Sequence, residues 1–318
     1  MSKIITITFS PCIDKSTSVP VLIPEKKLKC TAPKLEPGGG GINVARAIKK
    51  LGGTATAIYA AGGYTGKFFN KLVADEGVPA VIIESENETR ENIIVLEEST
   101  NQQYRFGMPG TELKEKEWNR FLVAIEEIKD VEFIVASGSL PPGVPADIFA
   151  RMGAIAKKRS IKFIADTSGD ALKYAAHEGA YLLKPNLGEL GSLVGKTYLE
   201  PGEACPAAKE IIGKGDCEVV VVSMGANGAM LITRDRVMKF LPPEVKRKST
   251  VGAGDSMVAG IVLELSRGKS LEESVQYGVA CGTAATINEG TELCRLQDVE
   301  KLYTAITAEN IDSVKENA

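Results

Sequence analysis

The sequence is short of the residues that build several common kinds of active site. It has one histidine, His177, which cannot by itself form a multi-histidine metal site and has no motif for Ser–His–Asp or Cys–His catalysis around it. We interpret His177 as a helix-end residue, because Gly179 follows closely behind it. Clusters of metal-ligating side chains are also missing. These absences disfavour metal-cluster chemistry and histidine-based nucleophilic catalysis.

Cysteine pairs, long apolar runs and a strong charge imbalance are absent as well. The six cysteines include no C-x-x-C pair, and the first apolar stretch, residues 4–9, is too short for a signal peptide. We therefore expect reduced thiols and a cytoplasmic protein. No run approaches membrane-spanning length, and the net charge of -3 gives no sign of nucleic-acid affinity. The expected partners are small molecules, with no nucleic acid and no membrane.

Alternating strands and helices make up most of the chain, whose 318 residues can form one large α/β domain or two smaller ones. The alternation predicts a mainly parallel sheet covered by helices on both faces, with ligands at the carboxyl ends of the strands. The strand patterns lie at residues 4–9, 54–61, 131–136, 161–166, 181–183 and 218–223. Polar candidates follow strands at Asp14, Ser139, Asp166, Lys184, Asn186 and Ser223.

Two segments interrupt this alternation. Residues 15–37 contain four prolines between short polar stretches and have no helical period. Residues 90–97 and 102–108 have strand character and flank a polar turn, which predicts a β-hairpin. We expect the two segments to pair into a small accessory sheet.

The most informative stretch is residues 249–256, Ser-Thr-Val-Gly-Ala-Gly-Asp-Ser. Gly252 and Gly254 allow a sharp turn, and the helix predicted at 254–267 adds unpaired N–H donors and a partial positive charge, which together suit a phosphate. Asp255 places a carboxylate at the same helix start, where the dipole favours its charged form and where it can take a hydroxyl proton. The alternative at this point is that Asp255 and Ser256 merely cap the helix.

A second glycine-rich stretch, Gly38 to Gly41, precedes a helix that ends at Gly52. Consecutive glycines are costly in chain entropy, so the run indicates close approach of the backbone to a ligand, with a linker as the alternative. Neither glycine motif has the register of a dinucleotide-binding fingerprint, because Met257 and Val44 stand where the third glycine belongs. Phosphoryl transfer through a base, an anion cradle and a magnesium nucleotide is the chemistry that remains.

The two glycine-rich motifs, about two hundred residues apart, resemble the two signatures of the ribokinase-like, PfkB-type sugar kinases. The resemblance covers essentially the whole chain, and it implies a ribokinase-like three-layer α/β fold with a mainly parallel central sheet and a small β-sheet lid. Residues 1–318 would form a single kinase domain, with lid insertions at about 15–37 and 90–108. Further matching stretches are Cys30-Thr-Ala-Pro, Tyr104-Arg-Phe, Gly138-Ser-Leu-Pro-Pro-Gly and Lys184-Pro-Asn.

The resemblance also implies an activity, transfer of the γ-phosphoryl group of Mg-ATP to the 1-hydroxyl of fructose 6-phosphate, and a role for particular residues. The base falls on Asp255, and the anion hole on Gly252, Ala253 and Gly254. Sugar contacts fall on Asp14, Gly39, Gly40 and Asn43, and the sugar phosphate near Arg90 and Ser139. The nucleotide and magnesium region falls on Lys27, Lys184, Asn186, Glu189, Ser223, Gly225 and Gly228. A potassium site falls on backbone oxygens around Ser249, Val251, Ala285, Asn288 and Gly290.

Substrate choice depends on one position of the glycine run. Family members that phosphorylate fructose 1-phosphate at carbon 6 or tagatose 6-phosphate at carbon 1 usually carry lysine where this chain has Gly40. The all-glycine run therefore favours fructose 6-phosphate. A non-enzymatic sugar-phosphate regulator on the same scaffold is disfavoured, because Asp255 and its glycines are intact. The resemblance further implies a homodimer paired through the lid, whose edges and apolar faces would otherwise stay exposed.

Three of these side chains also have ordinary structural interpretations. Lys184 can be a solvated strand end, as lysine usually is. Arg90 can form a surface ion pair with Glu88 or Glu91, and Asp14 can be a turn residue.

Overall fold

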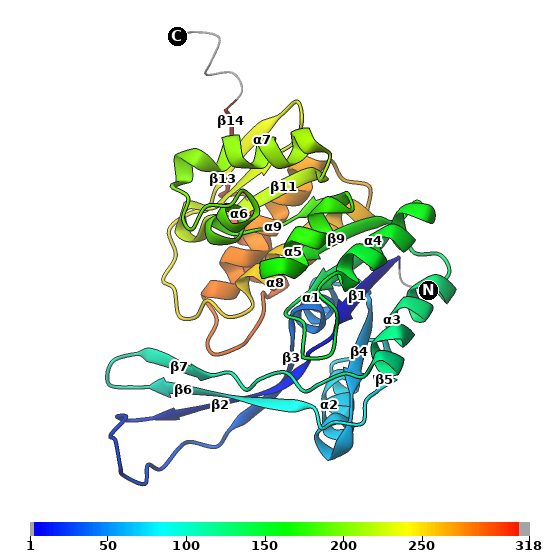
Figure 1. The fold of residues 1–318 in the computed structure, drawn as a ribbon. Coiled ribbons are helices and arrows are strands. Elements are labelled where there is room, and N and C mark those ends of the chain that lie inside the picture. The colour runs from blue at the N-terminus through cyan, green and yellow to red at the C-terminus, as the bar shows by residue number, and fades with distance from the viewer. Residues whose placement is uncertain (1–2, 312–318) are drawn as a thin grey trace.

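The computed structural model describes residues 3–311, which build two sheets (Figure 1). Within these residues the large sheet has ten strands in the order β14-β13-β12-β11-β10-β9-β8-β1-β4-β5. The strands from β11 to β5 in this order are parallel, and β12, β13 and β14 join antiparallel at one edge. The bounds of this sheet's strands are β1 Ile4–Thr8, β4 Thr56–Ala61, β5 Ala80–Glu84, β8 Phe133–Ser137, β9 Lys162–Asp166, β10 Ala180–Leu183, β11 Cys217–Ser223, β12 Ala229–Ile232, β13 Val237–Leu241 and β14 Thr307–Asn310.

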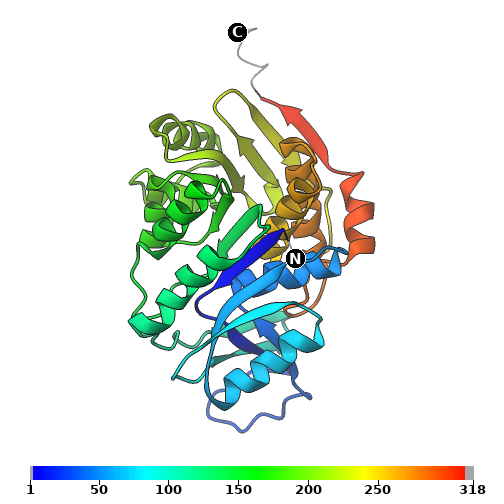
Figure 2. The same ribbon diagram turned by 90° about the vertical axis from the view of Figure 1, so that its right-hand side faces the viewer.

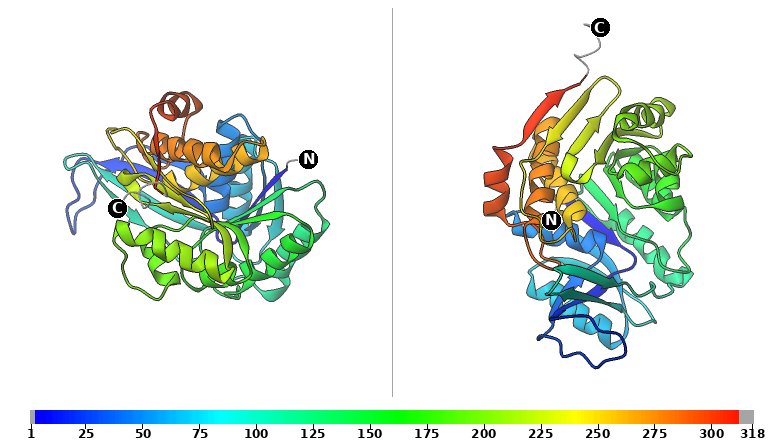
Figure 3. Two further views of the ribbon diagram at one scale, coloured as in Figure 1. Left: turned by 90° about the horizontal axis from the view of Figure 1, so that it is seen from above. Right: turned by 90° about the vertical axis from the view of Figure 1, so that its left-hand side faces the viewer.

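Helices cover both faces of this sheet, as the view from above shows (Figure 3). One apolar core joins the sheet to α1 (Gly40–Lys50), α2 (Gly63–Asp75), α8 (Ala253–Ser266), α9 (Leu271–Thr286) and α10 (Leu296–Tyr303). The other joins it to α3 (Glu115–Glu127), α4 (Ile148–Lys158), α5 (Gly169–His177), α6 (Leu187–Leu193) and α7 (Ala204–Lys214). Successive strand residues alternate between the two cores; Ile134 lies in one and Val135 in the other. The expected three-layer α/β fold is confirmed.

The smaller sheet has the strand order β3-β2-β6-β7 and projects from the body of the molecule (Figures 1 and 2). We call it the lid; it consists of β2 (Cys12–Val19), β3 (Lys34–Gly38), β6 (Arg90–Glu97) and β7 (Gln102–Phe106). Strand β2 lies between the antiparallel β3 and the parallel β6, so the two interrupting segments do pair with each other. The lid begins at Cys12, three residues before the expected boundary at residue 15.

The start of α8 is fixed by close packing of α8 on α9. Every residue from Ser256 to Glu264 is buried, which is typical of a helix enclosed on all sides. A Cβ atom at Gly260 would lie 2.6 Å from the Cys281 Sγ atom and 3.0 Å from the Gly278 Cα atom, so the two helices touch through small residues. This packing holds the amino-terminal end of α8 rigidly at the carboxyl edge of the parallel strands.

Two strands were not predicted from the sequence. Strand β5 is short and only partly buried at the edge of the sheet, and β14 consists of the exposed sequence Thr-Ala-Glu-Asn. Strand β5 carries a short apolar run, Ala80-Val-Ile-Ile, that the sequence interpretation passed over, whereas β14 has no apolar pattern; each is held by backbone pairing to a neighbour, β4 and β13 respectively. His177 is the last residue of α5, as expected.

Candidate active site

The carboxyl edge of the parallel strands meets the lid at the start of α8. Gly252 is the N-cap of that helix and has a φ of 69°, in the left-handed region that favours glycine. The N–H groups of Ala253, Gly254 and Asp255 lie in the first turn, where an α-helix leaves its donors without intrahelical partners. This turn therefore presents the anion-binding geometry that the sequence predicts.

Asp255 does not cap the helix. No side-chain cap hydrogen bond forms at this end of α8, and one Asp255 oxygen, Oδ2, accepts a hydrogen bond of 2.9 Å from the Asn43 amide nitrogen, Nδ2. Burial, together with the nearby Asp166 carboxylate, raises the pKa of Asp255 to about 7. The charged form that the helix start was expected to favour is therefore opposed by burial and by the Asp166 carboxylate. A carboxylate of this pKa is a better proton acceptor near neutral pH.

A buried ion pair lies beside the start of α8. The Lys184 Nζ atom is 3.0 Å from Asp166 Oδ1, and the Lys184 side chain is only 6% exposed. Burial acts against the charged form of Lys184, but the carboxylates of Asp166, Glu189 and Asp255 together outweigh it and raise the pKa, so the ammonium persists. A Cβ atom at Gly254 would lie 3.5 Å from Lys184 Nζ, which places this charge next to the helix start. The interpretation of Lys184 as a solvated strand end is wrong.

The glycine run packs its backbone against the strand ends. Gly39 has a φ of 114°, which non-glycine residues rarely adopt, and Gly40 opens α1. A Cβ atom at Gly40 would lie 2.3 Å from Ser137 Oγ and 2.7 Å from the Gly138 nitrogen. The linker interpretation is therefore wrong, and this contact brings Asn43, one turn into α1, to Asp255.

The lid supplies Asp14 from β2. Asp14 is buried and accepts a hydrogen bond of 3.0 Å from the Asn92 amide on β6, the residue directly opposite it in the sheet. Burial raises the pKa of the Asp14 carboxyl. The turn interpretation of Asp14 is wrong, since the residue lies inside a strand. Sequence reasoning missed Asn92, because only the strand register places it beside Asp14.

Arg90 and Arg105 extend the lid's polar face. Arg90 donates hydrogen bonds of 2.7 and 3.1 Å to the carbonyl oxygens of Met108 and Ser10, and its Nε atom is buried without an acceptor in the described part of the chain. It does not form the alternative pair with Glu91, which faces Lys15 instead. Arg105, which was not predicted, donates to the Thr250 hydroxyl across 3.3 Å and so connects β7 with the motif before α8.

The residues expected to contact a nucleotide lie along the next strand ends. Asn186 is the N-cap of α6, and its side chain and that of Glu189 cap the helix reciprocally, each through a hydrogen bond of 2.9 Å. Burial raises the pKa of Glu189. Asn186 and Ser223 form a parallel bridge, which ties this helix to the end of β11. Gly225 begins the short turn after β11, and Gly228, with a φ of 78°, ends it.

The residues expected around a potassium ion come from two loops that are hydrogen-bonded together. The Ser249 hydroxyl donates to the Gly290 carbonyl over 2.7 Å, and the Ser249 nitrogen donates to the Thr286 carbonyl over 3.2 Å. Asn288 is buried and donates to the carbonyl of Leu293 over 2.9 Å, which shapes the second loop. The expected position Val251 lies in the first of these loops, and Ala285 lies in the last turn of α9, just before the second loop.

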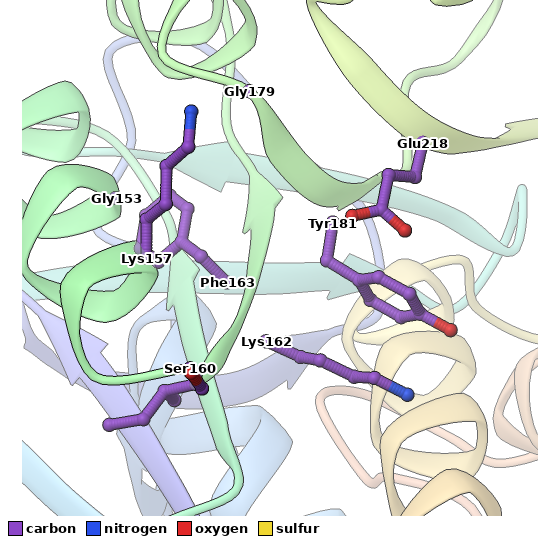
Figure 4. A pocket seen from close by; sticks show the side chains of 9 residues that line it. Gly153, Lys157, Ser160, Lys162, Phe163, Gly179, Tyr181 and Glu218 are labelled. Atoms are coloured by element: carbon purple, nitrogen blue, oxygen red, sulfur yellow. The ribbon is translucent and has the colours of Figure 1, made fainter.

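Two features lie away from this cluster. Lys27 is exposed in the loop beyond the outer end of β2, and the structure does not bring it to Asp255 within one chain. A hollow of about 280 Å³ opens at the opposite, amino-terminal ends of β9, β10 and β11, where Lys162 lies 4.5 Å from the centre of the Tyr181 ring (Figure 4). Ser139, by contrast, follows β8 at the carboxyl edge and is exposed there.

A parallel α/β core, a β-sheet lid and a buried carboxylate beside an anion-binding helix start define a kinase of the ribokinase-like class. The chain belongs to the pfkB family of carbohydrate kinases, whose family model matches residues 6–298. It is 46% identical over 308 residues to ATP-dependent 6-phosphofructokinase isozyme 2 of Escherichia coli, covering 96% of this chain and 100% of that protein. The isozyme 2 of Mycobacterium tuberculosis is 44% identical, covering 95% of this chain and 89% of its own.

The solved structures agree with the sequence comparison. The crystal structure of phosphofructokinase-2 from Escherichia coli in complex with potassium matches with a TM-score of 0.92 and 46% sequence identity, covering 96% of this chain and 99% of that one.

No helix within residues 3–311 has the length and apolar character needed to cross a bilayer.

Proposed function

We propose that this protein is an ATP-dependent 6-phosphofructokinase, which transfers the γ-phosphoryl group of ATP to the 1-hydroxyl of fructose 6-phosphate. The observation that carries the proposal is Asp255, a carboxylate with a pKa of about 7 at the start of α8, held by Asn43. In the reaction the hydroxyl oxygen forms the new bond to the γ-phosphorus, Asp255 takes the hydroxyl proton, and ADP leaves with the electrons of the broken bond. The identity to isozyme 2 relatives supports the choice of substrate.

The sugar binds between the lid and the glycine run in this proposal. Asp14 and Asn43 offer a carboxylate and an amide to the sugar hydroxyls, and the backbone at Gly39 and Gly40 allows close approach. Arg90, at the start of the lid strand β6, and Ser139, after β8, bind the phosphate already on the sugar. An arginine suits that role, because its planar guanidinium can bind a phosphate through two hydrogen bonds.

The transferring phosphoryl group sits at the start of α8. The N–H groups of Gly252, Ala253 and Gly254 stabilise its negative charge, and Lys184 adds a positive charge that is already held in place by Asp166. Because these donors are fixed before the reaction, they need little reorganisation as charge develops.

The nucleotide lies along the ends of β10 and β11 in the proposed complex. Asn186, Glu189, Ser223, Gly225 and Gly228 surround it there. Within residues 3–311, no group of three or more acidic, cysteine or histidine side chains is arranged to hold a metal. That fits magnesium bound mainly by nucleotide phosphates and water, with the neighbouring carboxylates in support. When bound, magnesium supplies positive charge against the developing negative charge on the phosphates.

A potassium ion fits the two loops around Ser249 and Gly290. The hydrogen bonds that tie these loops bring backbone oxygens together, and oxygen atoms are suitable ligands for a hard cation. The relative from Escherichia coli has been solved with potassium. In this chain the ion would stiffen the loop that leads into α8 and thereby fix the anion hole.

We propose that residues 1–318 form one kinase domain and that two copies pair through their lids. The strand register places Asp14 and Asn92 on the lid face toward the catalytic residues and Ile93 with Phe106 on the other face. Phe106 is 50% exposed there, and such an apolar face on an open sheet calls for a covering partner.

Lys27 gives a second reason for the dimer. From Asp14 to the end of β2 at Val19, an extended strand covers about 17 Å, and Lys27 lies beyond that end. We propose that Lys27 reaches the nucleotide phosphates in the site of the second copy.

A panel of phosphosugars assayed with Mg-ATP tests the proposed reaction. We expect the highest kcat/KM with fructose 6-phosphate and product phosphorylated at carbon 1. A preference for fructose 1-phosphate or tagatose 6-phosphate would overturn the substrate assignment. Tight binding of fructose 6-phosphate without turnover of any sugar would favour a non-enzymatic regulator.

A further inference from the structure

A buried arginine with no role in the proposed reaction lies behind the base. Arg46 on α1 is 2% exposed. Its Nε and Nη2 atoms donate to the Glu76 carboxylate over 2.8 and 2.5 Å, and Nη2 also donates to Glu36 over 3.2 Å. Its Nη1 atom donates to the Pro37 carbonyl over 2.7 Å and to Asn43 Oδ1 over 3.3 Å. The guanidinium is thus held in one orientation by α2, by the lid strand β3 and by its own helix.

The contact with Asn43 decides which way that amide points. Asn43 Oδ1 accepts from Arg46, and Asn43 Nδ2 donates to Asp255 Oδ2 over 2.9 Å. A flipped amide would turn its NH₂ group toward the guanidinium, which has only donors, and its oxygen toward the carboxylate, which has only acceptors. Both contacts would become repulsive. The guanidinium therefore fixes the hydrogen bond that the base receives.

We propose that Arg46 is a positioning residue: through the Asn43 amide it orients Asp255, leaving the carboxylate's other oxygen, Oδ1, for the sugar hydroxyl. The inference rests on the proposed function, because it concerns the base of that reaction. Arg46 contacts Asn43, which is an expected sugar contact, and it acts on Asp255 only through the Asn43 amide.

The same network connects the base to the lid and to the expected potassium loop. Glu36, which lies on β3 directly before Pro37 and Gly38, accepts from Arg46 and from the Thr291 hydroxyl, the latter over 2.5 Å. Thr291 is buried and directly follows Gly290. A displacement of β3 or of this loop would therefore reach Asn43 through Glu36 and Arg46, all in direct hydrogen-bond contact.

Arg46→Lys tests the proposal. Lysine keeps the positive charge between Glu36 and Glu76, but it cannot also donate in the fixed directions of a guanidinium. We expect kcat with fructose 6-phosphate to fall about 10- to 100-fold, the scale of a small misplacement of a reacting group, with KM for ATP little changed. A kcat within about twofold of the wild type overturns the proposal.

Titration of Asp255 in the substrate-free protein gives a readout that does not depend on turnover. The groups facing Asp255 are Asp166 and Asp14, which raise its pKa, and Asn43 and Lys184, which lower it. Loss of the oriented Asn43 donor removes one lowering contact, so the Asp255 midpoint should rise by about one unit in Arg46→Lys, followed by NMR of carboxyl-labelled aspartate. An unchanged midpoint counts against the proposal.

A double-mutant cycle separates positioning from general destabilisation. In an Asn43→Ala background, Arg46→Lys should change kcat by less than about twofold, because the link to the base is already cut. The same fold-loss in both backgrounds would show that Arg46 does not act through Asn43. Arg159→Lys is the matched control: Arg159 donates to the carbonyls of Ile125 and Ile128 far from the base, and its loss should lower stability without moving the Asp255 midpoint.

Two further outcomes need a separate interpretation: an Arg46→Lys variant that does not fold, and a wild type that binds the sugar without phosphorylating it. Should Arg46→Lys fail to fold, Asn43→Leu replaces it, because leucine adds no charge and can neither accept from Arg46 nor donate to Asp255. We then expect a raised Asp255 midpoint and a loss of kcat, and a wild-type profile would overturn the inference. A wild-type protein that binds but does not phosphorylate fructose 6-phosphate would refute the proposed function, while the NMR titration would still decide the role of Arg46.

Discussion

Replacing Asp255 by asparagine removes the base but keeps the shape of the side chain. The variant amide can still accept the hydrogen bond that Asn43 Nδ2 makes to Oδ2 in the wild type, so the fold and the binding of both substrates should persist. What is lost is the ability to accept the hydroxyl proton. Loss of a general base costs about 10²- to 10⁴-fold in rate, and we expect kcat of Asp255→Asn to fall by that amount.

The pKa of Asp255 also predicts how kcat/KM of the wild type depends on pH. With a pKa of about 7, about 9% of Asp255 is ionised at pH 6 and about 91% at pH 8, so kcat/KM of the wild type should rise about tenfold over this range. The residual activity of Asp255→Asn should lack this rise. If Asp255 instead had its ordinary pKa near 4, the wild-type profile would be flat between pH 6 and pH 8.

Stability provides an independent check on that pKa. The folded state raises the pKa of Asp255 above its unfolded value, so it binds the proton more tightly, and the free energy of unfolding should fall as pH rises from about 4 to about 7. Asp255→Asn has no such proton, so its melting temperature should exceed that of the wild type at pH 8 and match it near pH 4.

The assays are steady-state kinetics across pH, direct binding of Mg-ATP and fructose 6-phosphate, and thermal unfolding of both proteins. Near-normal kcat in Asp255→Asn, with binding intact, would refute the assignment of Asp255 as the base. A flat wild-type pH profile, together with the expected loss of kcat in Asp255→Asn, would refute only the raised pKa of Asp255.

Three further predictions concern the rest of the site. Arg90→Ala should raise KM for fructose 6-phosphate by roughly 10- to 100-fold, the loss of a hydrogen bond between charged groups, and KM for ATP far less; equal rises would mean that Arg90 only holds the carbonyls of Ser10 and Met108. Lys184→Met should lower kcat and, because Lys184 lowers the pKa of Asp255, shift the acid limb of kcat/KM to higher pH; an unmoved limb contradicts this placement. Phe106→Glu should convert a dimer into monomers in light scattering. Val123 is exposed to a similar extent but lies on α3, so Val123→Glu should leave the dimer intact. A monomeric, fully active wild type would rule out the lid interface.

Much of the fold could be predicted because burial leaves a local pattern. The apolar strands β1, β8 and β11 are buried along almost their whole length, and such runs alternate with helical periods, which is enough to indicate a parallel sheet. Of the two edge strands, β5 has a short apolar run but is mostly exposed, and β14 has no such run, so only its pairing with β13 reveals it.

The candidate site likewise has residues that local sequence signals predict and contacts that they do not. Local signals were enough to predict that a glycine turn carries Asp255 into a helix start, because turn and helix signals act over a few residues. It also pointed to Lys184 and Asn186 at strand ends, where parallel sheets collect their ligands.

The hydrogen bonds and the charge effects among these side chains follow from the tertiary structure, because the residues involved are far apart in the chain. Asn43 and Asp255 are 212 residues apart in the chain, and the charge of Asp166 from a third element raises the pKa of the base. Arg46 carries no local signal of its role, since its partners come from β3, α2 and its own helix. A pKa and a hydrogen-bond direction depend on desolvation and on the nearest charges in space, and a local sequence pattern records neither.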